Sequence, residues 1–197
     1  MKKKIGCLPA LLILVVISVI AYGLNYFIGG FLDKYQRPWA FSSDPNAPLL
    51  PGKWQGNFTD PDGVTKTIQL EIFVPQTTAE RWTKSGRRKR GLYRTRRNFD
   101  GKATISSKLG TEPYEVWGSV SRDDDCLFEL HFNVPEEKYP ILPNFYFNLV
   151  NGGRWQGHQM TLPVSFTYRL PDKSAYSNSA DPRFSRQPMV TLTRQKE

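Results

Sequence analysis

The chain has 197 residues, of which 39% are hydrophobic, so it is long enough to bury the core of one domain. Only two cysteines are present, which excludes a small scaffold held together by several disulfides. It carries 27 basic and 18 acidic side chains, and the resulting net charge of +9 at pH 7 favours anionic partners.

Residues 5–32 form an uncharged apolar run that directly follows Lys2, Lys3 and Lys4. About 20 helical residues are enough to cross a bilayer core of roughly 30 Å, and this run is longer. Basic residues on its N-terminal side predict a cytoplasmic N-terminus. We therefore predict that residues 1–32 are a cytoplasmic tail and a single-pass transmembrane anchor, with the rest of the chain exported. This topology is typical of a bacterial inner-membrane protein with a periplasmic domain.

The alternative is a cleaved signal peptide, because Ala21, Tyr22 and Gly23 place small residues in an A-x-A-like arrangement. The apolar run continues past this point as far as Leu32. The apolar region of a signal peptide usually spans only about 7–15 residues. The sequence therefore favours a retained membrane anchor over cleavage.

Residues 33–52 are interpreted as a proline-rich tether that precedes a domain at residues 53–197. Prolines occur in this segment at positions 38, 45, 48 and 51. Proline-rich linkers are semi-rigid and span about 3.1 Å per residue, so about twenty residues would hold the domain up to about 60 Å from the bilayer. An alternative position for Trp39 and Phe41, near the start of the segment, is at the lipid headgroups, where aromatic rings favour the interface.

Beyond the tether, apolar and polar residues alternate with a period of two, most clearly at residues 68–74, 126–134 and 160–168. A period of two with one polar face indicates half-solvated strands. Further strands are expected at residues 54–58, 99–106, 114–121, 144–150, 154–160 and 189–194. We predict an all-β domain of about eight strands, built as a single antiparallel barrel or sandwich.

Three turns are predicted between neighbouring strands, where Asp, Asn and Gly cluster. Residues 60–63 should close the first hairpin, and residues 122–125 should close a later one. The triple aspartate of the second turn lacks the ligand spacing of a calcium loop, so we expect a solvated turn. The sequence Asn151-Gly152-Gly153 should close the strand at residues 144–150 onto one at residues 154–160.

A short motif, Gly52-Lys53-Trp54, opens the first predicted strand, and Arg194 ends the last one. This arrangement resembles the lipocalin-like barrels, in which the arginine packs against the tryptophan at the floor of the barrel. The resemblance implies a barrel and, as one alternative function, a small-ligand carrier with an open apolar cavity. It gives no ligand-binding residues.

Few side chains are placed to support catalysis. Cys126 alternates with apolar residues and is expected to be buried, while His131 and His158 are expected to be structural or solvent-facing. These three residues lack zinc-ligand spacing, and no nucleophile elbow or phosphate-binding loop occurs. We expect no enzyme activity, cofactor or metal. An envelope hydrolase with paired carboxylates stays as a lesser alternative, because that signature is geometric.

Positive charge is concentrated at residues 81–102, where ten basic residues and one acidic residue give a local charge of +9. We call this range the basic segment. Its basic residues are Arg81, Lys84, Arg87, Arg88, Lys89, Arg90, Arg94, Arg96, Arg97 and Lys102.

We predict that the basic segment engages an anionic partner, namely an anionic lipid, lipopolysaccharide or an acidic protein surface. A solvated loop that only improves solubility is the alternative. The mixture of basic and aromatic residues also suits single-stranded nucleic acid, but the predicted export argues against that partner. An immunity-type inhibitor of a periplasmic protein would show the same features as a binding module.

Overall fold

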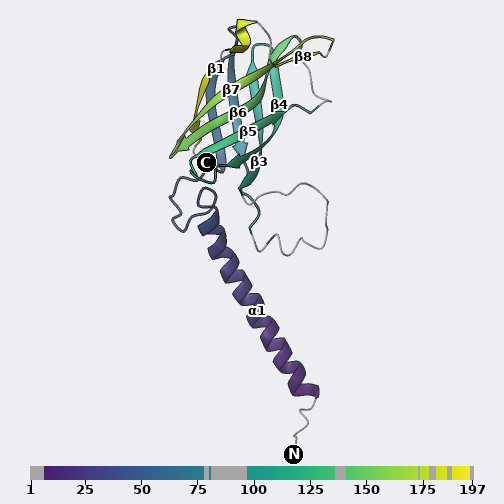
Figure 1. Ribbon diagram of the computed structural model, residues 1–197, viewed down its shortest axis with the longest axis vertical. Helices are drawn as coiled ribbons and strands as arrows, with labels where there is room; N and C mark the ends of the chain where they lie inside the picture. The colour runs from purple at the N-terminus through teal and green to yellow at the C-terminus, as the bar shows by residue number, and fades with distance from the viewer. Residues whose placement is uncertain are drawn as a thin grey trace, which may run out of the picture.

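The computed structural model describes residues 7–77, 80, 97–135, 141–172, 174–177, 181–185 and 188–195. The chain begins with the helix α1 (Cys7–Gln36), which leads to one end of a β-sheet domain (Figure 1). The domain contains β1 (Gly52–Thr59), β2 (Thr65–Ile72), β3 (Asn98–Ser107), β4 (Gly110–Val120), β5 (Leu127–Asn133), β6 (Asn144–Gln156), β7 (Gln159–Arg169), β8 (Ala175–Tyr176), the 3-10 helix η2 (Pro182–Ser185) and β9 (Met189–Arg194).

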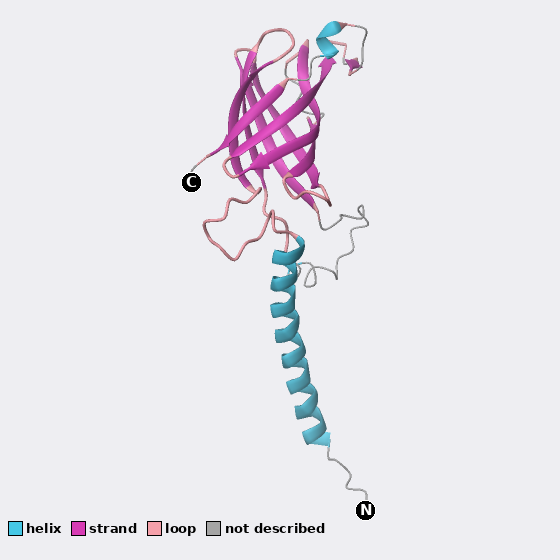
Figure 2. Cartoon of the chain, turned by 60° about the vertical axis from the view of Figure 1, so that its left-hand side comes forward, coloured by secondary structure: helices cyan, strands magenta, loops and turns pink. Residues whose placement is uncertain are grey.

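The sheet closes on itself as an eight-stranded antiparallel barrel. Strands β1 to β7 pair with their neighbours in chain order, and β9 pairs with both β7 and β1. The two-residue strand β8 only extends the end of β7. Closure leaves these strands without an open edge (Figure 2). The all-β prediction is confirmed, and the architecture is a barrel rather than a sandwich.

The barrel interior is filled by side chains from alternate positions of each strand. Aromatic rings meet there at short range, with ring centroids 4.7 Å apart for Phe58 and Phe147 and 5.1 Å apart for Phe132 and Phe147. Phe166 adds a further contact to Phe147 at 5.4 Å. An eight-stranded barrel has an interior just wide enough for side chains to fill, and this one is filled by rings.

The two ends of the barrel differ in what they adjoin. Strands β1, β3, β5 and β7 start at the end beside α1, which we call the helix-side end (Figure 1). Because neighbouring strands are antiparallel, β2 and β4 end there, and β9 ends there as well. The opposite end, which we call the distal end, holds the β1–β2 and β3–β4 turns.

The prediction that residues 33–52 form an extended tether is wrong. α1 continues to Gln36, and the residues after it fold back against the helix-side end of the barrel. Trp39 is 1% exposed and its ring centroid lies 5.7 Å from that of Phe99, so it is not at a lipid headgroup. Leu50 is also buried and donates its backbone N–H to the carbonyl of Trp39 at 2.8 Å. Burying such a side chain contributes about 1.5–3 kcal/mol, which outweighs the preference of the prolines for an extended chain.

The predicted turn at residues 151–153 is also wrong, because β6 runs through it to Gln156. The pairing of β6 with β7 shifts register between Val150 and Arg154, as in a β-bulge. A Cβ atom on Gly153 would lie 2.6 Å from the ring of Phe128, so this glycine permits close packing rather than a turn. The chain instead turns at Gly157, whose φ is 59°. The turns at residues 60–63 and 122–125 are confirmed.

α1 has the length and apolar composition of a membrane anchor or a signal sequence. Over residues Leu11–Gln36 its most apolar window has a mean hydropathy of 2.4 and is not buried against the rest of the protein. The backbone remains helical through Ala21 and Gly23, the residues of the alternative cleavage motif.

Candidate functional site

Most of the basic segment lies outside the described residues. The residues to which this applies are Arg81, Lys84, Arg87, Arg88, Lys89, Arg90, Arg94 and Arg96. Arg97 and Lys102 are described, as is the chain up to Thr77. Since β2 ends and β3 begins at the helix-side end, both flanks of the segment lie beside the end of α1 (Figure 1).

The two described basic residues are both in ion pairs. Arg97 stands just before β3, where its Nη1 lies 2.7 Å from Oδ1 of Asp125 and also donates to the carbonyl of Ser121. Lys102 is on the outer face of β3, and its Nζ lies 2.9 Å from Oε2 of Glu71 on β2. Arg97 therefore links the start of β3 to the β4–β5 turn at the helix-side end. The charge of Lys102 is paired with the carboxylate of Glu71.

α1 is joined to the barrel by a buried arginine. Arg37 donates from Nη1 to the carbonyl of Gln76 at 2.8 Å, and it forms an ion pair with Asp33 one turn earlier. Its guanidinium also lies 4.7 Å from the ring centroid of Phe41. Arg37 is 1% exposed. The chain that leaves β2 toward the basic segment is thus hydrogen-bonded directly to the end of α1.

The floor of the barrel shows the contact that the lipocalin-like resemblance implies. Trp54 and Arg194 are paired across β1 and β9, and the guanidinium carbon lies 4.4 Å from the centroid of the indole. Arg194 also donates from Nη1 to the carbonyl of Pro51 at 3.0 Å. A cation over an indole face at this distance is attractive, so the contact stabilises the joint between the first and last strands.

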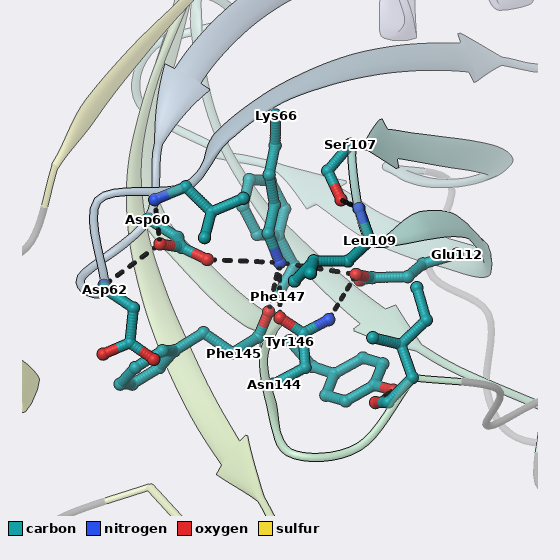
Figure 3. A network of polar contacts seen from close by, with 12 residues as sticks. Asp60, Asp62, Lys66, Ser107, Leu109, Glu112, Asn144, Phe145, Tyr146 and Phe147 are labelled. Atoms are coloured by element: carbon teal, nitrogen blue, oxygen red, sulfur yellow. Dashed lines mark hydrogen bonds and ion pairs between the residues drawn. The ribbon is translucent and has the colours of Figure 1, made fainter.

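The distal end contains a buried polar network that the sequence analysis missed (Figure 3). At its centre, Nζ of Lys66 donates to Oδ1 of Asn144 and to the carbonyl of Phe145, each at 2.9 Å. The same nitrogen lies 3.4 Å from Oδ2 of Asp60 and 3.3 Å from Oε1 of Glu112. The side chains of Lys66, Asp60 and Glu112 are each only 1% exposed.

Each carboxylate of this network has further donors. Oδ1 of Asp60 accepts the backbone N–H groups of Asp62 and Val64 at 3.0 and 2.9 Å. Glu112 accepts the hydroxyl of Tyr114 at 2.7 Å and an amide N–H of Asn144. Burial, followed by the charge of Glu112, raises the pKa of Tyr114 well above its usual value, so this hydroxyl stays a donor. The network thus joins the β1–β2 turn to β2, β4 and β6.

The remaining candidate residues lie apart from one another. Cys126 is half-buried in the turn before β5 rather than buried in the strand, and burial raises the pKa of its thiol. His131 stacks on Trp117 outside the barrel, with ring centroids 5.4 Å apart. The carbonyl of His158 accepts the backbone N–H of Arg194 at 2.9 Å. Among the residues described here, no group of three or more His, Cys, Asp or Glu side chains is arranged to hold a metal ion.

Comparison with known proteins identifies no family. No protein-family model matches the chain, and no curated protein matches it either. Among solved structures, a redesigned β-barrel aligns with 79% of this chain and 100% of its own, at 20% identity and a TM-score of 0.37. A de novo designed fluorescence-activating β-barrel aligns with 77% of this chain and 99% of its own, at 14% identity and a TM-score of 0.35.

Proposed function

We propose that the protein is a single-pass, membrane-anchored binding module without catalytic activity, whose basic segment engages anionic phospholipid headgroups. In this proposal α1 spans a bacterial inner membrane with its N-terminus in the cytoplasm, and the barrel lies on the periplasmic face. The observation that supports it is the bond from Arg37 to the carbonyl of Gln76. It ties the chain that enters the basic segment to the end of α1, and thus to the bilayer surface if α1 spans.

The range of electrostatic attraction decides which anionic partner is favoured. Each Lys or Arg near an anionic membrane contributes about 1 kcal/mol, so five engaged residues would contribute on the order of 5 kcal/mol. The attraction decays over about 8 Å at physiological ionic strength. A segment whose flanks lie beside the end of the anchor meets this condition for headgroups of the same membrane. Lipopolysaccharide phosphates and acidic proteins are not part of the membrane that α1 crosses, so they must first diffuse to the basic segment.

The alternative functions gain no support from the described residues. A small-ligand carrier needs an open cavity, whereas aromatic rings such as Phe58, Phe147 and Phe166 occupy the interior. A hydrolase needs a substrate to reach two carboxylates, whereas Asp60 and Glu112 are buried on either side of Lys66. An inhibitor of a periplasmic protein would use the same basic segment, so we treat it as an outcome of the test.

The test compares two full-length variants with the same change in net charge. In the first, Arg87, Arg88, Lys89 and Arg90 are replaced by Gln, which lowers the net charge by four. In the matched control, Thr65→Glu, Lys108→Glu and Asn133→Glu lower it by four at exposed positions of the distal end. Each chain is excised from cell membranes in polymer-bounded discs, and its lipids are quantified against the bulk membrane.

We expect anionic lipids to be enriched around the wild type and the control, and to return to the bulk proportion around the Gln variant. Equal enrichment around all three chains would refute the proposal. The same discs are crosslinked and searched for bound proteins. An acidic protein that is lost only from the Gln variant, with unchanged lipids, would replace the lipid as the partner.

A further inference from the structure

A groove of about 790 Å³ lies where the end of α1 meets the rim of the barrel. α1 contributes Tyr35 to its lining, the start of β3 contributes Arg97, and the turn after β4 contributes Ser121 and Arg122. We call this the junction groove. The lining residues named here are all described, and they lie at the opposite end of the barrel from the distal polar network.

The junction groove presents hydrogen-bond donors that the fold does not use. Arg122 is exposed and has no ion-pair partner in the described part of the chain. The hydroxyl of Ser121 accepts the backbone N–H of Asp123 at 3.3 Å, which leaves its own proton available. Tyr35 is exposed and its hydroxyl points to no partner among the described residues. Arg97, already paired with Asp125, forms the wall of the groove. Such a set of donors suits an oxyanion, and a guanidinium binds phosphate with two parallel hydrogen bonds.

The height of the groove above the apolar part of α1 matches the headgroup layer. The apolar run ends at Leu32, and Tyr35 follows three residues later, about 4.5 Å further along the helix axis. Below Tyr35, the exposed side chains of Phe31, Ile28 and Leu24 follow at spacings of three or four residues, which places them on one face of the helix. An acyl chain lying along this face would bring its headgroup to the groove.

We infer that the junction groove binds the phosphate of a phospholipid whose acyl chains lie along α1, with Arg122 as the cationic partner of the phosphate. The inference rests on the membrane anchorage in the proposed function, but not on the basic residues at positions 81–96. Of the basic segment, the C-terminal part with Arg97 lines the groove. The groove recognises a phosphate that zwitterionic and anionic phospholipids share. The basic segment, in contrast, responds to the net charge of the headgroups.

The experiment uses the full chain in a detergent that contains no phosphate. Short-chain phosphatidylcholine and phosphatidylglycerol are titrated separately, and bound lipid is counted by native mass spectrometry. We expect one lipid to bind per chain with either headgroup. Arg122→Gln should weaken both affinities about tenfold, which corresponds to about 1.4 kcal/mol. Lys108→Gln, the matched loss of one exposed charge in the β3–β4 turn, should leave them unchanged.

Three outcomes would overturn the inference: no lipid bound by the wild type, equal affinities for Arg122→Gln and Lys108→Gln, or equal binding of a galactosyl diacylglycerol that has no phosphate. The Gln variant at residues 87–90 separates the two proposals. If it binds phosphatidylcholine as the wild type does but keeps its anionic lipid shell in membranes, the groove is supported and the basic segment is not. If it loses phosphatidylcholine while Arg122→Gln keeps it, the groove inference fails.

Discussion

Lys66 offers the sharpest test of what holds the distal end together. Its ammonium group is 1% exposed, makes two hydrogen bonds of 2.9 Å, and lies within 3.4 Å of two carboxylates, Asp60 and Glu112. Lys66→Met keeps an unbranched side chain of similar length and removes only the charge and the donors. Both carboxylates then remain buried without their cation. Asn144 and the carbonyl of Phe145 each lose a donor.

Removing one partner of a buried ion pair costs about 3–5 kcal/mol, because the remaining charge stays uncompensated. A typical domain has a free energy of unfolding of about 5–15 kcal/mol, so we expect Lys66→Met to remove about a fifth or more of the stability. The assay is urea unfolding of the full-length chain in detergent at pH 7, followed by tryptophan fluorescence. A loss below about 1 kcal/mol would refute the claim that Lys66 compensates buried charge.

A second variant distinguishes lost charge compensation from general damage to the core. Adding Glu112→Gln to Lys66→Met removes one of the two uncompensated charges and keeps a side chain that can still bond to Tyr114. Asp60 retains two backbone donors in either variant. Residues in one network show coupling energies of about 0.5–3 kcal/mol, so the double variant should regain about 1–2 kcal/mol. If it is instead less stable than Lys66→Met alone, charge is not the cause of the loss.

Two further predictions concern Tyr146 and the residue Trp39, which is buried at the helix-side end of the barrel. Tyr146→Phe removes a hydroxyl that donates to the carbonyl of Ile141 at 2.6 Å, which should cost about 1 kcal/mol at neutral pH. Burial, and then the charge of Glu112, raises the pKa of Tyr146 to about 12 from its ordinary 10, so the stability it contributes is complete below pH 10 and is lost as pH rises from 10 to 12. Tyr146→Phe should therefore flatten the loss of stability that urea unfolding measures between pH 10 and 12, and an unchanged slope would contradict this. Trp39→Ala should cost about 3–5 kcal/mol in thermal or urea unfolding if the ring is a core residue packed on Phe99, whereas a tether residue would cost almost nothing.

The strands could be predicted because alternation reports directly which side chains face inward. In β2 the buried positions Ile68, Leu70 and Ile72 repeat every second residue, as the sequence indicates. The same pattern places Lys66 on the inward face, so the sequence could have predicted a buried polar group at this position. It could not have predicted the partners of Lys66. Glu112 and Asn144 lie 46 and 78 residues further along the chain, and only closure of the barrel brings them together.

Two of the errors of interpretation have a common cause in long-range packing. A pair of glycines reads as a turn, but Gly153 lies inside β6 because the ring of Phe128 on the neighbouring strand occupies the space of its side chain. A proline-rich stretch is typical of a spacer, but Trp39 and Leu50 are buried at the helix-side end of the barrel. Two large apolar residues in an otherwise polar linker were the available sign that the segment packs.

Because residues 33–52 are not an extended tether, the distance between the basic segment and a membrane crossed by α1 is restricted. An extended linker would allow the barrel to stand up to about 60 Å from the bilayer, whereas attraction to headgroups fades within about 8 Å. Arg37 is hydrogen-bonded to Gln76, and Trp39 is buried in the helix-side end of the barrel. These contacts hold that end of the barrel at a fixed distance from the end of α1. Contact between the flanks of the basic segment and a membrane crossed by α1 would then follow from folding itself. Breaking that joint, for example with Arg37→Ala, should therefore weaken lipid enrichment around the chain even though all the basic residues of the segment remain.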